Sequence, residues 1–389
     1  MVSLLGIRLS GATKSQALAK ITGWLKGGHF HYVVTPNPEI LLAATRDHDE
    51  ELFYILNQAN LSLADGTGLK FAAWLYGKRL PRVTGADLIK PLLEVAAEQG
   101  KKVLFILWSK GLSRPADITF SLKEKYPNLI FEIKEIDREE NIDTGLTADI
   151  MLVALGAPYQ EKFIFHQGKK IAGLKVAIGI GGALDFITKK AKRAPKIWRV
   201  VGLEWLWRLI KQPKRWKRMF KAVIVFPYDI LVYRFIMPHL YRPNVACLLY
   251  KKVAGKYQIL IVERTLDPGH WQLPQGGTDG LDIKSTGIKE LNEEIGNNKF
   301  KIMAVYDFLY RYKFDSSLGK FPNQRHTGYK GQKQALVIAE YLGRDDEIKI
   351  NFWDHSAFKF VPTDELLTAV HPLRRSSTEI YLNKFKEII

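Results

Sequence analysis

The sequence predicts an α/β chain with two domains of different architecture and a basic segment between them. Short β-branched runs alternate with amphipathic segments over residues 1–190, a pattern typical of a Rossmann-like parallel sheet covered by helices. Over residues 241–389 longer strand-like runs surround one short acidic helix, which indicates an α+β domain. Residues 191–240 between them are rich in cations and tryptophan. A length of 389 residues suits two or three domains.

The composition is that of a folded protein. Apolar residues make up 47% of the chain and charged residues 25%, which excludes disordered, collagen-like and coiled-coil classes. The single cysteine, Cys247, has no partner for a disulfide or a thiolate zinc site, so a reducing cytoplasm is expected. Residues 2–7 are too few for a secretory signal, and residues 222–238 contain Asp229 and Arg234 and are too short to span a membrane. Any contact with a membrane is therefore expected to be peripheral.

The first domain is expected to carry its ligand at the carboxyl ends of parallel strands. Buried strands are predicted at residues 33–34, 103–107, 150–155 and 176–180, with helices at 40–57 and 88–99. Polar residues and glycines follow these strands and form loops at residues 35–39, 64–68, 156–162 and 179–185. In the last loop a helix N-terminus and glycine N–H groups are suited to a diphosphate. The loops together favour a nucleotide-type substrate.

The same loops carry a family resemblance. The motifs occur in order at 35–40 (TPNPEI), 64–69 (ADGTGL), 83–88 (VTGADL), 156–162 (GAPYQEK), 181–186 (GGALDF), 192–198 (KRAPKIW) and 202–209 (GLEWLWRL). Over residues 1–220 this resembles the WecG/TagA/CpsF glycosyltransferase family. The resemblance implies inverting transfer from a UDP-sugar donor, typically of the UDP-N-acetylmannosamine type, to an undecaprenyl-diphosphate-linked sugar. It implies products such as teichoic acid linkage units, and no obligatory metal in this domain.

The resemblance also assigns residues to the transfer. An inverting transfer needs a general base beside the acceptor hydroxyl, and Asp65 matches the family's proposed base. Thr35 and Asn37 match pocket residues, although both could instead cap the helix that follows. The further substrate-binding residues that we expect are Arg82, Gln160, Gly181 and Gly182.

The basic segment holds most of the net charge. Residues 186–221 contain eight lysines, five arginines and one acid, Glu204, so they carry +12 of the chain's +18. Four of the nine tryptophans lie between residues 198 and 216. Cations interleaved with tryptophan favour an anionic membrane surface. A solvated basic face and an RNA-binding arm are the alternatives.

A cationic helix face is predicted within this segment. Arg208, Lys211, Arg215 and Arg218 are spaced by 3, 4 and 3 residues, although Pro213 is expected to start a new helix and rotate the register. The resemblance implies that the three arginines complete the transferase site on substrate phosphates, for which a bidentate guanidinium is suited.

The second domain carries an acidic helix behind a glycine pair. Gly276-Gly277 precedes Lys289-Glu290-Leu291-Asn292-Glu293-Glu294-Ile295-Gly296, which resembles the Nudix box. On a helix Glu290, Glu293 and Glu294 lie at i, i+3 and i+4, so their carboxylates are expected to converge on Mg²⁺ or Mn²⁺, with Glu293 and Glu294 catalytic. The alternative is an acidic face that is simply solvated.

Flanking motifs point to one branch of that family. The runs at 241–245 (YRPNV), 271–277 (WQLPQGG) and 331–334 (GQKQ) resemble the RNA pyrophosphohydrolase and dinucleoside polyphosphate hydrolase subgroup. This resemblance implies an α/β/α sandwich in which Arg242 and Lys333 contact phosphates and Asp354 is a further metal ligand.

Four departures from the pattern bear on activity. Asp282 replaces a glutamate, six residues instead of seven follow it, Lys289 replaces an arginine, and Asn297 fills an apolar position. Full hydrolysis, altered hydrolysis and nucleotide binding alone stay open.

The sequence thus predicts a bifunctional enzyme at the cytoplasmic face of the membrane. Its expected partners are a UDP-sugar, a polyprenyl-diphosphate-linked acceptor, an anionic membrane, and a nucleoside polyphosphate or RNA 5′ end. The main rival is an RNA end-processing enzyme whose transferase half is a non-catalytic scaffold. The donor sugar, the acceptor, the reason for the fusion and the oligomeric state stay undecided, and a homo-oligomer is left open.

Overall fold

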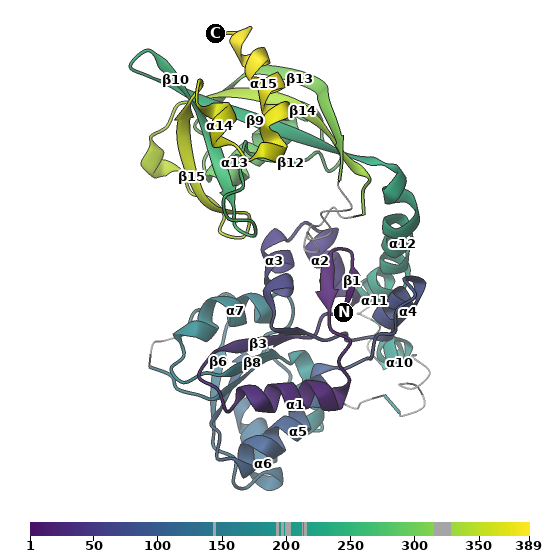
Figure 1. The fold of residues 1–389 in the computed structure, drawn as a ribbon. Coiled ribbons are helices and arrows are strands. Elements are labelled where there is room, and N and C mark those ends of the chain that lie inside the picture. Colours follow the sequence, from purple (N-terminus) through teal and green to yellow (C-terminus); the bar gives the residue numbers. More distant parts are fainter. Residues whose placement is uncertain are drawn as a thin grey trace. The chain divides into compact units, whose positions relative to one another are not determined.

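The chain divides into two compact units. The computed structural model describes residues 1–142, 145–191, 194–195, 198, 204–211, 213, 216–314 and 328–389, without the side chains of residues 204, 208 and 211. The first unit extends to Tyr233 and the second begins at Arg234 (Figure 1).

The first unit is built on a parallel six-stranded sheet, as predicted. Its strand order is β4-β3-β8-β7-β5-β6, and every pairing within it is parallel. The strands are β3 (His31–Val34), β4 (Leu61–Ser62), β5 (Val103–Trp108), β6 (Phe131–Ile136), β7 (Ile150–Ala154) and β8 (Val176–Gly179). All four predicted strands are confirmed. The two edge strands were not predicted, because β4 has two residues and β6 alternates apolar and charged side chains.

Helices cover both faces of this sheet. They are α1 (Lys14–Trp24), α2 (Pro38–Thr45), α3 (Glu50–Gln58), α4 (Thr67–Leu75), α5 (Gly85–Glu98), α6 (Pro115–Lys125), α7 (Tyr159–Gln167) and α8 (Leu184–Ile187), with 3₁₀ turns η1 (Gly168–Lys170) and η2 (Gly181–Ala183). The predicted helix at 88–99 is α5. The single helix predicted at 40–57 is wrong, because Asp49 starts a new helix by accepting a hydrogen bond from the Leu52 amide at 3.0 Å.

Two hydrophobic layers explain the apolar strand runs. Alternate residues of β5 pack on opposite faces, with Leu104 and Ile106 in the layer of α2 and α3, and Val103 and Phe105 in the layer of α1 and α5. A strand that is buried on both faces needs apolar residues at successive positions. A hairpin of β1 (Val2–Leu4) and β2 (Ile7–Leu9) adds to the first layer.

The basic segment folds partly onto the first unit. Helix α10 (Glu204–Lys211) is followed by α11 (Trp216–Phe220), the π-helical η4 (Lys221–Val225) and α12 (Phe226–Leu231), and the chain continues through η5 (Val232–Ile236) and η6 (Met237–His239). Phe226 and Ile230 are buried in the core layer that holds α2. Pro227 lies in the first turn of α12 and does not break the helix. Within the described residues, no helix has both the length and the apolar character needed to cross a membrane.

The second unit is a mixed seven-stranded sheet between helices. Strands β9 (Tyr241–Val253) and β10 (Lys256–Arg264) form a hairpin, and β9 pairs in parallel with β14 (Gly331–Tyr341). The other elements are β11 (Trp271–Gln272), β12 (Gln275–Gly277), α13 (Ile283–Ile295), β13 (Phe300–Lys313), η7 (Asp345–Glu347), β15 (His355–Pro362), α14 (Leu366–Ala369), η8 (Pro372–Arg374) and α15 (Arg375–Lys386). Helix α13 packs on one face of the sheet and α15 on the other.

Candidate functional site

A pocket of about 1070 Å³ opens at the carboxyl ends of the parallel strands in the first unit. The loops that follow β3, β5, β7 and β8 all contribute to its wall. Of the described side chains that line it, seven are cationic and four are acidic. The excess of positive charge suits an anionic ligand.

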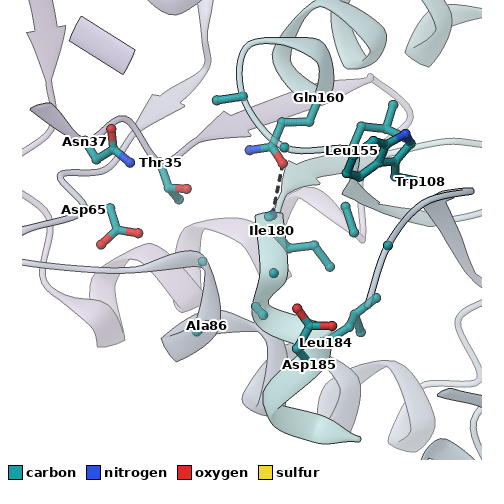
Figure 2. A pocket seen from close by; sticks show the side chains of 18 of the residues that line it. Thr35, Asn37, Asp65, Ala86, Trp108, Leu155, Gln160, Ile180, Leu184 and Asp185 are labelled. Carbon is teal, nitrogen blue, oxygen red and sulfur yellow. Dashed lines mark hydrogen bonds between the residues drawn. The ribbon is translucent and has the colours of Figure 1, made fainter. Parts of the chain in front are cut away.

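Asp65, Asn37 and Thr35 lie on one side of this pocket (Figure 2). The Asn37 Oδ1 atom accepts a hydrogen bond from the Ile40 amide at 2.9 Å and caps α2, so the capping interpretation holds for this residue. For Thr35 that interpretation is wrong, because its hydroxyl donates to the Gly179 carbonyl at 3.4 Å instead. Both residues nevertheless line the pocket.

The Asp65 carboxylate is accessible from the pocket. Asp65 is half-buried, and its backbone amide donates to the Pro36 carbonyl at 2.8 Å, which joins the loop after β4 to the loop after β3. Gly66 follows with φ +110°, a conformation that side-chain-bearing residues rarely adopt. The glycine thus turns the chain into α4 directly after the carboxylate. Arg82 also lines the pocket.

The glycine loop after β8 is held by Gln160. The Gly181 amide donates to Gln160 Oε1 at 3.0 Å (Figure 2), so this N–H is engaged within the protein. Gln160, predicted to bind substrate, lines the pocket, is buried and donates from its amide to Glu161. Gly181 and Gly182, also predicted to bind substrate, line the same pocket. A Cβ at Gly182 would lie 3.0 Å from the Asp185 carboxylate.

Sequence reasoning missed an aromatic and cationic wall at the other side of the pocket. The Arg138 guanidinium lies 3.7 Å from the centre of the Trp108 ring and 4.9 Å from that of Tyr159. Its Nε donates to the Leu155 carbonyl at 3.0 Å. Arg138 and Trp108 line the pocket, and Arg138 follows the edge strand β6, which was not predicted because charged residues interrupt its apolar ones.

The basic segment brings one of the three predicted arginines to the pocket. Arg218 lines it and donates from Nη2 and Nε to Glu39 on α2, at 2.6 and 2.7 Å. Lys221 pairs with Asp47 at 2.6 Å. Arg215 and the side chain of Arg208 lie outside the described residues, so the predicted cationic face is untested.

In the second unit, each glycine of the pair makes room for a predicted functional side chain. A Cβ at Gly276 would lie 1.6 Å from Glu290 Oε2, and a Cβ at Gly277 would lie 2.0 Å from an Arg242 Nη atom. Residues larger than glycine would displace both groups. Glu290 and Arg242 are accordingly buried on opposite sides of the short strand β12.

The three α13 carboxylates have different surroundings. Glu294 is buried, with Oε2 2.7 Å from Nδ1 of the buried His355, whereas Glu293 is half-exposed. The Lys289 ammonium lies 3.7 Å from Glu290, 3.6 Å from Glu293 and 3.9 Å from Asp279. No three histidine, cysteine, aspartate or glutamate side chains of the described chain are arranged to hold a metal ion. In this arrangement Glu290 and Glu293 already contact a cationic side chain, that of Lys289.

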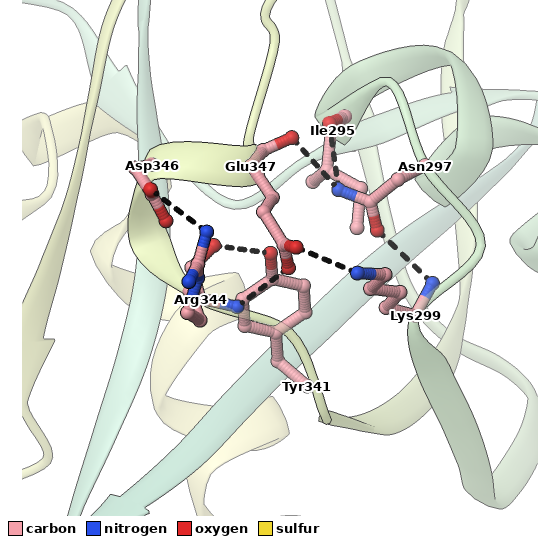
Figure 3. A network of polar contacts seen from close by, with 7 residues as sticks. All are labelled: Ile295, Asn297, Lys299, Tyr341, Arg344, Asp346 and Glu347. Atoms are coloured by element: carbon pink, nitrogen blue, oxygen red, sulfur yellow. Dashed lines mark hydrogen bonds and ion pairs between the residues drawn. The ribbon is translucent and has the colours of Figure 1, made fainter.

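Two departures from the Nudix pattern have structural roles. Asp282 caps α13 by accepting a hydrogen bond from the Ser285 amide at 2.9 Å. Asn297 closes the other end of α13, where its Nδ2 donates to the carbonyls of Ile295 and Glu347 (Figure 3).

Lys333 and Asp354 are the last two predicted residues of this unit. The Lys333 ammonium lies 4.3 Å from the centre of the Phe308 ring. The Asp354 carbonyl accepts a hydrogen bond from the Thr265 amide at 3.0 Å, and its sequence neighbour His355 contacts Glu294.

Comparison with known proteins agrees with the two-part architecture. Residues 2–239 match the glycosyl transferase WecG/TagA/CpsF family, and residues 240–382 match the NUDIX domain. An N-acetylglucosaminyldiphosphoundecaprenol N-acetyl-beta-D-mannosaminyltransferase of Bacillus subtilis is 36% identical over 196 residues, which are 48% of this chain and 74% of the relative. The enzyme of the same name from Staphylococcus aureus is 29% identical over 238 residues, covering 59% and 91%.

Solved structures resemble the second unit. The Ap4A hydrolase of C. elegans is 18% identical with a TM-score of 0.29, and the match covers 38% of this chain and 98% of that one. For the E. coli dihydroneopterin triphosphate pyrophosphohydrolase the identity is 16%, the TM-score 0.30 and the coverage 37% and 99%.

Proposed function

The chain belongs to the WecG/TagA/CpsF glycosyltransferase family and joins this domain to a Nudix hydrolase domain, and from this premise we propose the reactions of each. The first unit transfers an N-acetylmannosamine-type sugar from a UDP donor to a polyprenyl-diphosphate-linked sugar, as the names of its relatives describe for them. The observation that carries this proposal is the shared pocket of Asp65, Asn37, Thr35 and the Gly181 loop.

Asp65 acts as the general base of the transfer. Its carboxylate takes the proton of the acceptor hydroxyl while the hydroxyl oxygen bonds to the anomeric carbon and the bond to the UDP oxygen breaks. The cationic lining, which includes Arg82, Arg138 and Arg218, stabilises the negative charge of the departing diphosphate. The side chains of Asn37 and Thr35 hold the loop beside Asp65 by hydrogen bonds with the backbone of Ile40 and Gly179.

A donor screen with an Asp65 variant tests this function. UDP release is measured on vesicles that carry a polyprenyl-diphosphate sugar, with Asp65→Asn and with Glu98→Gln as an exposed control. Loss of a general base lowers the rate by roughly 10²-fold or more. Turnover of Asp65→Asn at the wild-type rate would remove Asp65 from the mechanism, and no UDP release by any variant would reject the function.

The first unit meets its lipid-linked acceptor at a membrane surface. On the helical run 216–231 the exposed large apolar residues are spaced by four, four, four and three: Trp216, Phe220, Ile224, Tyr228 and Leu231. Helix α4, which contacts α12, exposes Phe71 and Trp74. Lys217, Arg218 and Lys221 lie beside the first two of these residues, Trp216 and Phe220, in the sequence. Exposed apolar side chains beside cations favour the interface of an anionic bilayer.

Vesicle flotation separates lipid from RNA as the partner. We expect flotation with anionic vesicles, its loss in Trp216→Ser/Ile224→Ser, and its retention in Phe120→Ser, which changes an exposed phenylalanine on α6. Indifference to lipid together with salt-sensitive RNA binding would overturn the membrane proposal.

The Nudix domain acts on a nucleoside polyphosphate. The buried Arg242, for which Gly277 leaves room, supports phosphate binding. The domain match implies a divalent ion, typically Mg²⁺, which would neutralise phosphate charge. The contacts of Lys289 with Glu290 and Glu293 favour a second candidate, a domain that binds nucleotide without cleaving it.

Release of cleaved products, separated by chromatography, distinguishes the two candidates for the full-length chain. Dinucleoside polyphosphates, UDP-sugars and 5′-triphosphorylated RNA are incubated with Mg²⁺ or Mn²⁺, with Glu294→Gln as the comparison. Release that Glu294→Gln abolishes supports hydrolysis. Nucleotide binding with no release from any substrate supports the binding domain.

A further inference from the structure

Glu161 is a buried carboxyl group that no step of the proposed transfer uses. It is the third residue of α7, directly after Gln160, and only 1% of its surface is exposed. Burying a carboxyl group is costly unless its oxygens are hydrogen-bonded. Its contacts therefore indicate what the position requires.

One oxygen of this carboxyl group faces Gln160. The Gln160 side-chain amide donates from Nε2 to Glu161 Oε1 at 2.8 Å. The second oxygen, Oε2, is buried and has no hydrogen-bond partner among the residues that the structure describes. Gln160, a residue of the pocket wall, is thus the side chain that hydrogen-bonds to Glu161 in the part of the chain that the structure describes.

Gln160 also hydrogen-bonds to the glycine loop. Its Oε1 accepts the hydrogen bond of the Gly181 amide at 3.0 Å, and a Cβ at Gly179 would lie 2.7 Å from its Nε2. The amide therefore needs its oxygen toward Gly181 and its nitrogen toward Glu161. A flipped amide would set N–H against N–H at Gly181 and oxygen against oxygen at Glu161.

The protonated, neutral form of the Glu161 carboxyl group can accept the hydrogen bond from Gln160. Burial raises the pKa of the Glu161 carboxyl to about 7, and the hydrogen bond from Gln160 partly opposes this rise. The neutral acid keeps a carbonyl oxygen that accepts the Gln160 N–H without placing a charge in the core. A glutamine at this position would present the same acceptor.

We propose that Glu161 is a positioning residue of the transferase: its carboxyl group orients the Gln160 amide, which fixes the Gly181 turn in the shape that receives the donor diphosphate. The link to the donor rests on the proposed function. The hydrogen-bond relay from Glu161 to Gly181 is a property of the fold and can be tested separately. Glu161 lies behind the pocket wall and touches no reacting atom in this scheme.

Substitutions at Glu161 separate hydrogen bonding from packing. Glu161→Gln keeps the acceptor, whereas Glu161→Met fills a similar volume without one. Hydrogen exchange of the Gly181 amide is followed by NMR, and UDP binding to the full-length chain is measured by calorimetry. We expect Glu161→Gln to preserve both properties within about threefold, because the relay remains. We expect Glu161→Met to speed exchange and to weaken UDP binding by roughly tenfold, as loss of a buried acceptor does.

Gln160→Ala serves as the comparison, since it removes the acceptor of Gly181 directly. It should reproduce the faster exchange of Glu161→Met. Equal protection of Gly181 in the wild type and in Glu161→Met would overturn the positioning role. Faster exchange in Glu161→Met, in a chain that never binds UDP, would support the relay and would count against the donor assignment alone.

Discussion

Replacement of Glu161 by glutamine should stabilise the first unit, and the gain should depend on pH. An exposed glutamic acid has a pKa near 4.5, whereas burial raises the pKa of Glu161 to about 7. Between these values the unfolded chain loses a proton that the folded chain keeps. Folding therefore becomes less favourable as the pH rises from 4.5 to 7, and the penalty is constant at higher pH.

The size of the penalty follows from the two pKa values. At 1.36 kcal/mol for each pH unit, ionisation of Glu161 costs the folded state about 3 kcal/mol at pH 8. At pH 5 the cost is under about 1 kcal/mol, since this pH is only about half a unit above the pKa of the unfolded chain. Glutamine carries no charge at either pH, so Glu161→Gln should exceed the wild type in unfolding free energy by these amounts.

Urea unfolding monitored by tryptophan fluorescence measures this difference. Seven of the nine tryptophans precede residue 234, so the signal reports mainly on the first unit. The comparison is made at pH 5 and pH 8, with Glu124→Gln on the exposed face of α6 as the control. A stability difference between Glu161→Gln and the wild type that is equal at both pH values would refute the reasoning, as would a pH-dependent difference in the control.

Three further predictions concern the capping and charge contacts of both units. Asn37→Ala removes the cap of α2 and should lower the unfolding free energy by about 1 kcal/mol, with Asn37→Ser restoring most of it in urea unfolding. Gly276→Ala would place a methyl group against the Glu290 carboxylate and should abolish release of cleaved products or nucleotide binding by the second unit; wild-type function would show that Glu290 can move without loss. Lys289→Met removes an ammonium within 4 Å of Glu290 and Glu293 and should tighten Mn²⁺ binding, measured by electron paramagnetic resonance, by roughly tenfold, while the exposed Lys284→Met should not.

The fold could be predicted where side-chain periodicity reflects burial. The apolar run of β5 predicts a strand that is buried on both faces, and the structure confirms it. The edge strand β6 was not predicted, because charged residues interrupt its apolar ones and most of the strand is only partly buried. The break between α2 and α3 was missed for another reason, since a single Asp49 side chain decides it against a continuous helical pattern.

The candidate site divides in the same way. The Gly181 loop could be predicted because it ends a predicted strand and parallel strands end at one edge of the sheet. Asp65 follows β4, which was not predicted, and was proposed from the family motif. Glu161 could not be assigned a role from the sequence, because it adjoins Gln160 within one motif. Only the fold shows that Glu161 is buried outside the pocket lining and hydrogen-bonds to Gln160. Asp282 replaces a glutamate of the Nudix pattern, and only the structure shows that its side chain caps α13.

The pairing of Arg218 with Glu39 has a consequence for how an anion would enter. Both partners line the pocket, and the side chain of Arg218 is 57% exposed whereas that of Glu39 is 18% exposed. An ion pair with one solvent-exposed partner contributes about 0 to 1 kcal/mol, so breaking it costs little. An incoming phosphate can replace the Glu39 carboxylate as the partner of the Arg218 guanidinium. Helix α11, which carries Arg218, would then be held by the bound anion and no longer by α2.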